Sequence, residues 1–200
     1  DDCNMTGIEV AYELRNATDH IIGSPTEIMA YGMPYKLLWD ELSKVNPNYH
    51  NICNTFINFY SSYTYGNTPY PYGTISVIDC SQVEGMVNLM KEVNTSTYLS
   101  PFVESNLQSM DGYEPSIFYD MGDYVRTILH NNSLLLARFN QQLLLLVPEK
   151  GNTPSYYTAL RSGGTVLPIR TYSGITISDP SSNPIVTQAL NKNLYYKATH

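Results

Sequence analysis

The sequence is poor in charged residues, in cysteine and in long apolar runs. Only 14% of its 200 residues are charged, and 11 Lys and Arg face 18 Asp and Glu, which gives a formal net charge of −7. A chain with so few cations offers no basic face to DNA or RNA. The apolar run 134–147 is interrupted by Arg138, Asn140, Gln141 and Gln142, so we predict no transmembrane helix. Nucleic-acid binding and membrane spanning are therefore not expected.

Cysteine is scarce as well, with one residue each at positions 3, 53 and 80. An odd count cannot pair fully within one chain, and three are too few for a disulfide scaffold, so at least one thiol is free. Tyrosine, by contrast, is abundant at 18 residues. Tyr-, Asn- and Thr-rich surfaces with few lysines are typical of exported bacterial proteins. We expect a secreted, periplasmic or cell-surface protein, although the chain shows no signal peptide.

Hydrophobic residues make up 42% of the chain, enough for one sizeable core and one domain. Apolar spacing and turn residues predict helices over 5–16, 34–46, 49–64, 81–93, 120–130 and 133–147, and strands over 20–24 and 74–79. Ser81 and Glu84 have the spacing of a capping box. From 154 onward the pattern is β-like, with Gly163-Gly164 as a hairpin turn, and the tail 193–200 is predicted as a strand or a helix.

Strand–helix–strand order in the first half predicts an α/β sheet with helices on its faces. The first predicted helix starts only two or three residues after Cys3. We therefore expect a strand before Cys3 that this chain does not contain, so that the chain begins inside a domain. Cys3 then lies at the carboxyl end of a strand and at the N-terminus of helix 5–16, where a thiolate is favoured.

Two interpretations of Cys3 remain open at this point. It is either a small buried hydrophobe or a nucleophile, which needs a histidine as its acid and base. His20, His50, His130 and His200 stand in no recognisable base motif, so the chain's own histidines do not decide the question.

The stretch "DDCNMTGIEVAYELRNATDHIIGSPTEIMAYGMPY" resembles the nucleophile region of the clostripain family of cysteine peptidases. The matching residues are Asp1, Cys3 and Met5, then Glu9 to Leu14, Ser24-Pro25, and finally Gly32, Pro34 and Tyr35. Weaker similarity continues in "ISVIDCSQV", "YSGITISDP" and "YYKATH". The resemblance implies a caspase-like three-layer sandwich with a mixed central sheet flanked by helices, whose first part lies outside this chain. Residues 1–150 would carry the nucleophile, and 151–200 would form the β-rich closing segment of the same domain.

By the same resemblance, Cys3 is the nucleophile of a cysteine endopeptidase that acts on protein or peptide substrates, and the catalytic histidine lies upstream. Clostripain-like enzymes cleave after Arg or Lys, and a buried cation needs a carboxylate partner. Asp1 matches one acidic position of the family. The position of a second acid is occupied by Tyr31, which predicts a weaker basic preference at P1. Glu27 is close to it in sequence and is either a substitute acid or a solvated surface carboxylate.

No metal is assigned from the sequence. Some clostripain relatives depend on calcium, so calcium is implied only by the resemblance. Asp111, Asp120 and Asp123 show no EF-hand spacing, and Asp120 and Asp123 are predicted in the first turn of helix 120–130.

A second function stays open. The chain can instead be a catalytically inactive caspase-like surface module that binds peptide or glycan through its tyrosine-rich segment 61–73. A His-Gly pair at the end of a strand upstream of this chain would favour the enzyme, and its absence would favour the module.

Overall fold

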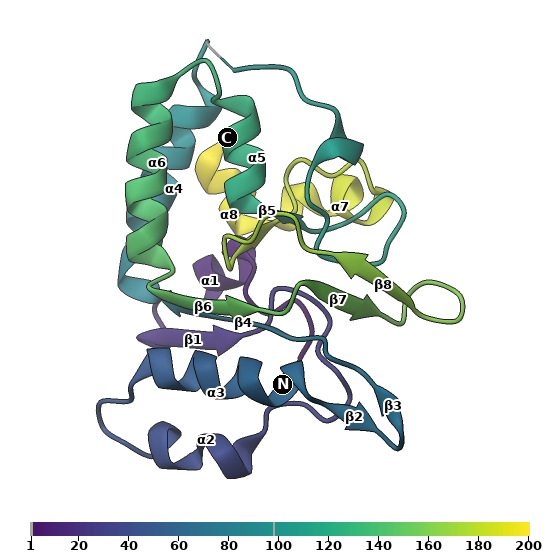
Figure 1. Ribbon diagram of the computed structural model, residues 1–200. Helices are drawn as coiled ribbons and strands as arrows, with labels where there is room; N and C mark the ends of the chain where they lie inside the picture. Colours follow the sequence, from purple (N-terminus) through teal and green to yellow (C-terminus); the bar gives the residue numbers. More distant parts are fainter. Residues whose placement is uncertain (1, 98) are drawn as a thin grey trace.

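The computed structural model describes residues 2–97 and 99–200, in which helices and strands are interspersed along the whole chain (Figure 1). The elements of the first half are α1 (Ile8–Leu14), β1 (His20–Gly23), α2 (Tyr35–Leu42), α3 (Tyr49–Ser61), β2 (Thr64–Tyr65), β3 (Thr68–Pro69), β4 (Thr74–Asp79) and α4 (Val83–Asn94). Those of the second half are β5 (Tyr119–Asp120), α5 (Met121–Ile128), α6 (Ser133–Leu146), β6 (Glu149–Asn152), β7 (Ser155–Thr158), β8 (Thr165–Pro168), β9 (Thr176–Ile177), α7 (Pro184–Ala189) and α8 (Leu194–Thr199).

The largest sheet has three strands in the order β1-β4-β6, and both of its pairings are antiparallel. Its central strand, β4, is buried from Thr74 to Ile78. Because successive side chains of a strand point to opposite faces, Ile75 and Val77 join one hydrophobic cluster and Ile78 joins another. The sheet thus separates two cores.

Helices cover both faces of this sheet (Figure 1). The helices α2 and α3 lie below it, and Phe56 and Tyr60 of α3 are fully buried against β4. Above it stand α1, α4, α5, α6 and α8, whose apolar side chains form the larger cluster. The predicted α/β arrangement with helices on both faces of a sheet is confirmed. No helix within the described ranges combines the length and apolarity of a membrane crossing.

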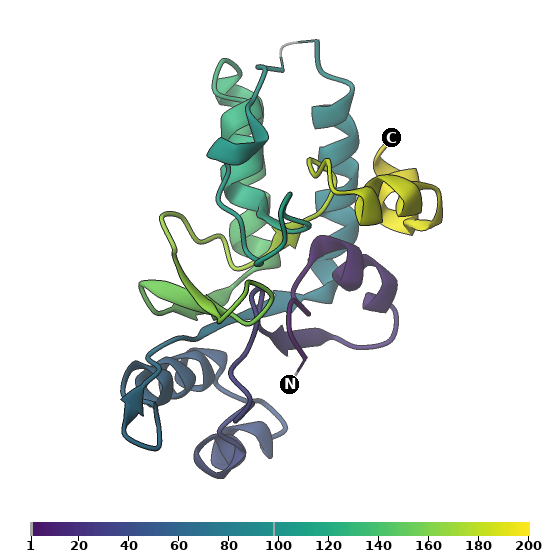
Figure 2. The same cartoon turned by 90° about the vertical axis from the view of Figure 1, so that its right-hand side faces the viewer.

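A second, fragmentary set of pairings ties the start of the chain to its end. Strands β5 and β9 pair antiparallel, and Gly7 forms a parallel bridge with Thr176 on β9. The carbonyl of Thr6 accepts a hydrogen bond from the Thr176 amide at 3.1 Å, while Thr6 also packs against Gly23 at the end of β1. In Figure 2 the first residues run beside β1 toward α1. The segment 5–7 is therefore extended and lies between β1 and β9.

This pairing corrects the predicted start of the first helix. The helix begins at Ile8, not at residue 5, and Gly7 precedes it without a side-chain cap. The reason is that Thr6 and Gly7 pair with Thr176 on β9. Such a long-range pairing leaves no trace in the local spacing of apolar residues. Cys3 consequently does not lie at a helix N-terminus, contrary to the prediction.

Other boundaries also differ. The capping box predicted at Ser81 is wrong, because Asp79 accepts the Ser81 amide at the start of a 3-10 turn that leads into α4. Strand β6 and helix α7 were not predicted, and the tail forms helix α8. The polar sequence of β6, Glu149 to Asn152, has no strand pattern of its own and is ordered by its pairing with β4.

Candidate active site

Cys3 lies in an exposed turn before α1. Its sulfur accepts a hydrogen bond from the backbone amide of Ile28, with an N···S distance of 3.4 Å. The next residue, Asn4, has a left-handed backbone with φ of 57°, and its amide donates to the carbonyl of Thr26 at 3.0 Å. Two hydrogen bonds thus fasten the cysteine turn to the loop that follows β1.

That loop is held from beneath by three buried hydroxyls. The hydroxyl of Thr74, at the start of β4, lies 2.7 Å from the hydroxyls of both Ser24 and Thr26. The Ser24 hydroxyl also donates to the carbonyl of Thr26 at 3.0 Å. Buried hydroxyls that satisfy one another stiffen the backbone that carries them. The carbonyl that receives the Asn4 amide therefore sits on a rigid support.

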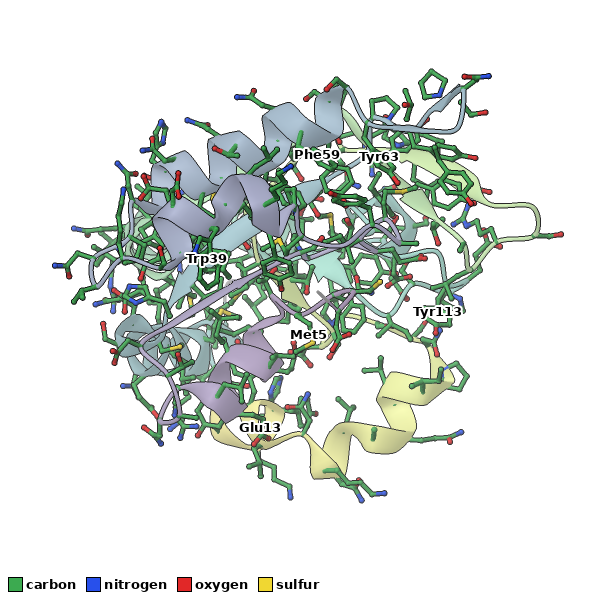
Figure 3. The ribbon with its side chains drawn as sticks, turned by 90° about the horizontal axis from the view of Figure 1, so that it is seen from below. Met5, Glu13, Trp39, Phe59, Tyr63 and Tyr113 are labelled. Atoms are coloured by element: carbon green, nitrogen blue, oxygen red, sulfur yellow. The ribbon has the colours of Figure 1, made fainter. Side chains whose placement is uncertain are left out.

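A cavity of about 30 Å³ lies behind the cysteine turn, lined among others by Asp2, Met5 and Ile28. Figure 3 shows Met5 just before α1. This volume holds a water molecule but not a long side chain.

The other two cysteines are buried. Burial raises the pKa of the Cys53 thiol on α3 to about 12, with a further contribution from Glu149. Burial also raises the pKa of the Cys80 thiol, helped by the nearby carboxylate of Asp79. Both thiols are therefore poor nucleophiles. Cys3 is the exposed cysteine of the three.

Each of the four histidines has its contacts in another part of the molecule. His20 packs on the ring of Tyr49, His50 lies 3.1 Å from Glu149, His130 contacts the carbonyl of Thr127, and His200 lies 3.4 Å from Asp179. None of these contacts involves Cys3, so the structure brings none of them to it as a base.

Of the two predicted substrate-binding residues, the structure describes only Tyr31. Asp1 lies outside the described residues. Tyr31 is 54% exposed, and its ring centroid lies 4.9 Å from that of Phe59 and 5.8 Å from that of Tyr63. Figure 3 shows Phe59 and Tyr63 close together, and they lie near the end of α3 and just beyond it. Tyr31 therefore lies on an aromatic cluster, three residues after the amide that reaches Cys3.

Glu27 is not a freely solvated carboxylate. It accepts hydrogen bonds from the hydroxyl of Thr158 and from the amide of Ala159, the latter at 2.9 Å. Both donors lie at the end of β7, and Glu27 directly precedes Ile28 in the chain. Sequence reasoning placed Glu27 near the site but missed its partners, because no local pattern connects residues 131 and 132 positions apart.

The acidic residues considered for calcium serve as backbone acceptors. Asp123 lies in the first turn of α5, as predicted, whereas Asp120 ends β5 and caps the helix by accepting the Asp123 amide. Asp111 accepts the amides of Tyr113 and Ile117 at 2.7 and 2.8 Å. Among the described residues, no group of three or more His, Cys, Asp or Glu side chains is arranged to hold a metal ion.

Comparison with known proteins gives a consistent result. The sequence profile of the Clostripain family matches residues 1–142. The crystal structure of a clostripain from Bacteroides thetaiotaomicron, in complex with the peptide inhibitor BTN-VLTK-AOMK, superposes with a TM-score of 0.90 at 44% identity and covers 100% of this chain and 85% of that one. The curated proteins gave no match.

Two further solved structures have longer chains. A secreted C11 cysteine protease from Bacteroides thetaiotaomicron matches with a TM-score of 0.90 at 44% identity, over 100% of this chain and 54% of its own. An inactive zymogen of a C11 protease from Parabacteroides distasonis matches with a TM-score of 0.85 at 28% identity, over 99% of this chain and 56% of its own. The present chain thus spans little more than half the length of these two relatives.

Proposed function

This chain belongs to the clostripain family, and on that premise we propose that it carries the nucleophile of a cysteine endopeptidase that prefers basic P1 residues. One observation supports this most strongly. Cys3 is exposed and receives a backbone N–H on its sulfur, whereas Cys53 and Cys80 are buried. An exposed sulfur with a fixed donor is suited to nucleophilic attack.

In the proposed mechanism, the Cys3 thiolate attacks the scissile carbonyl carbon and forms a tetrahedral oxyanion. Collapse of this intermediate expels the amine, which takes a proton from a histidine, and leaves a thioester on Cys3. Water, deprotonated by the same histidine, then hydrolyses the thioester and restores the thiol. The proposal takes this histidine from outside residues 1–200, as the family resemblance implies.

For substrate preference we propose Asp1 as the carboxylate that pairs with a P1 cation, with Tyr31 at the rim of the same pocket. The inhibitor bound by the Bacteroides relative ends in lysine next to its reactive group, which supports a basic P1. Tyr31 carries no charge at neutral pH, although its hydroxyl can accept a hydrogen bond. Discrimination between basic and uncharged P1 residues should therefore be weaker than with two carboxylates.

We further propose that the described chain is part of a caspase-like three-layer sandwich, whose mixed sheet is completed by strands outside residues 1–200. Residues 1–150 and 151–200 would then form one domain. Three links between the two parts support this: β6 pairs with β4, β9 pairs with β5, and Gly7 bridges Thr176. Secretion is proposed by analogy with the relative described as secreted.

The experiment is a P1-varied peptide library assayed on the full-length protein and on its Cys3→Ser variant. We expect cleavage after Lys and Arg by the wild type and none by Cys3→Ser. Cys80→Ala serves as a matched control because it removes a buried thiol and should retain activity. Peptide or glycan binding without cleavage by the wild type would instead support the inactive surface module, with the exposed hairpin β2–β3 as its contact surface.

A further inference from the structure

Glu27 joins the loop beside Cys3 to a hairpin far along the chain. Its carboxylate accepts the hydroxyl of Thr158 and the amide of Ala159, at the end of β7 and the start of the turn into β8. Figure 1 shows this hairpin continuing beyond β6 at the end of the sheet. Neither residue is near Glu27 in sequence, so the contact is a product of the fold.

The far end of this link is rigid. Thr158 is fully buried, and a Cβ atom added to Gly112 would lie only 2.1 Å from the Thr158 hydroxyl oxygen. The neighbouring Tyr156 donates its hydroxyl to the carbonyl of Asp111 at 2.9 Å. The Thr158 hydroxyl therefore has little room to move, and it fixes the carboxylate that it contacts.

The near end of the link lies next to Cys3. Ile28 follows Glu27 directly, and its N–H belongs to the peptide group between the two residues. That N–H is the one that reaches the Cys3 sulfur at 3.4 Å. An amide at this distance stabilises a thiolate only while its direction is kept. The side chain of Glu27 leaves the Cα at one end of this peptide group, so its anchoring restricts the backbone that carries the amide. The hydroxyl of Thr26 also donates to the carbonyl of the same peptide group, at 3.2 Å.

We propose that Glu27 is a positioning residue for Cys3: by binding Thr158 and Ala159, it holds the Ile28 amide on the sulfur. The role in catalysis rests on the proposed function, whereas the effect on the thiol does not depend on it. The charged and titratable groups named around the contact are Asp2 beside Cys3, Glu27 itself, and Asp111, Tyr156 and Arg161 near the hairpin. Asp111 and Tyr156 feel the charge of Glu27, and Arg161 acts on Tyr156.

Loss of Glu27 shifts the midpoint of the pH–rate profile of the Cys3 thiol in opposite directions, depending on whether Glu27 acts only as a nearby charge or as a positioning residue. This makes the proposal testable. A carboxylate near a thiol disfavours the thiolate through space, so removal of a mere charge would lower the midpoint of the pH–rate profile of the thiol. Removal of a positioning residue frees the Ile28 amide and raises that midpoint. The variant Thr158→Val removes the hydroxyl bond of this link without changing any charge, and leaves the bond from the Ala159 amide.

The experiment measures the rate of Cys3 alkylation by iodoacetamide against pH in the full-length protein, with mass spectrometry to follow each cysteine. In Glu27→Ala and Thr158→Val we expect the midpoint to rise by about half a pH unit to one unit, a loss of roughly three- to tenfold in thiolate at neutral pH. Thr158→Ser keeps the hydroxyl and should restore the wild-type midpoint.

Glu114→Ala is the matched control. It removes a carboxylate that pairs with Arg161 at 3.0 Å in the turn of the same hairpin, and it should leave the midpoint unchanged. Continued protection of Cys53 and Cys80 shows that a variant is folded. If Glu27→Ala exposes Cys53 and Cys80 to the reagent, the positioning role is judged from the midpoints of Thr158→Val and Thr158→Ser.

A midpoint that falls or stays constant in Glu27→Ala, or stays constant in Thr158→Val, would overturn the positioning role. Peptidase activity is assayed separately on the same samples. A raised midpoint in a protein that cleaves no peptide would keep the positioning role and reject the proposed function. If the wild type cleaves peptides but neither variant shifts the midpoint, the proposed function is kept and the positioning role is rejected.

Discussion

The hydroxyl of Tyr60 donates a hydrogen bond to the backbone carbonyl of Gly32 across 2.6 Å. Gly32 has a φ of 72°, a left-handed conformation that glycine adopts without steric cost. The residue before it, Tyr31, packs on Phe59. Helix α3 therefore fixes the backbone at position 31 by a hydrogen bond and by ring packing, close to the loop that reaches Cys3.

This fixed position leads to the first prediction. Tyr31→Asp should sharpen the preference for Arg and Lys at P1 over Gln by about tenfold in kcat/KM, because a close hydrogen bond between opposite charges contributes about 1.5–3 kcal/mol. The measurement is steady-state kinetics on three matched peptides. Tyr31→Phe keeps the ring and should change the ratio less than about twofold. An unaltered ratio in Tyr31→Asp would place position 31 outside the P1 pocket.

The second prediction concerns Asp1. Asp1→Asn should lower kcat/KM for Lys and Arg peptides by roughly ten- to a hundredfold and leave uncharged P1 peptides nearly unaffected, since it removes the charge that pairs with the cation. The same P1 series measures this effect. An equal loss on every peptide would mean that Asp1 supports the Cys3 turn and does not read the P1 side chain.

The third prediction concerns thiol reactivity in the unmodified protein. Cys3 should react with iodoacetamide at neutral pH far faster than Cys53 or Cys80, because burial raises the pKa of both of those thiols and withholds them from the reagent. Time-resolved alkylation with peptide mapping gives the three rates. Similar rates for all three would identify Cys3 as an ordinary structural cysteine.

The fourth prediction concerns a buried carboxyl on α1. Burial raises the pKa of Glu9, even though the amide and hydroxyl of Ser178 both donate to one of its oxygens at 2.7 Å and oppose the shift. Its other oxygen is buried and has no hydrogen-bond partner among the described residues. The folded protein therefore binds the proton more tightly than the unfolded chain does.

The sign of the pH dependence follows from this. The stabilisation by protonated Glu9 is complete below 4.5, the ordinary pKa of a glutamate in the unfolded chain, and is lost as the pH rises through the raised pKa of the folded state. Glu9→Gln keeps the oxygen that Ser178 contacts and removes the charge. We expect its Tm to match the wild type near pH 4.5 and to exceed it at neutral pH by about 2–4 °C, or about 1 kcal/mol. A gap that shrinks as pH rises would contradict this.

Sequence patterns predicted the elements whose residues determine their own structure. Strand β4 has the predicted bounds, and α6 differs from the predicted helix 133–147 by one residue, because apolar spacing and a following proline define such segments. The start of α1 was wrong, since Gly7 and its neighbours pair with β9. Strand β6 was missed for the same reason: its polar residues are ordered by a partner strand, not by their own pattern.

The site divides in the same way. Cys3 was singled out because a dense local motif surrounds it. The contact of Glu27 with Thr158 was not predictable, because it joins a loop to the end of strand β7, 131 residues further along the chain. A single sequence holds no local signal for such a contact.

We propose Cys3 as the nucleophile of a peptidase that accepts a basic P1 residue. The most direct measurement treats the full-length protein with a lysine-ended peptide acyloxymethyl ketone and locates the covalent adduct by peptide mapping. We expect one adduct, on Cys3, whose yield parallels the loss of peptidase activity, and no adduct in Cys3→Ser. An adduct on Cys53 or Cys80, or full inactivation without modification of Cys3, would contradict it.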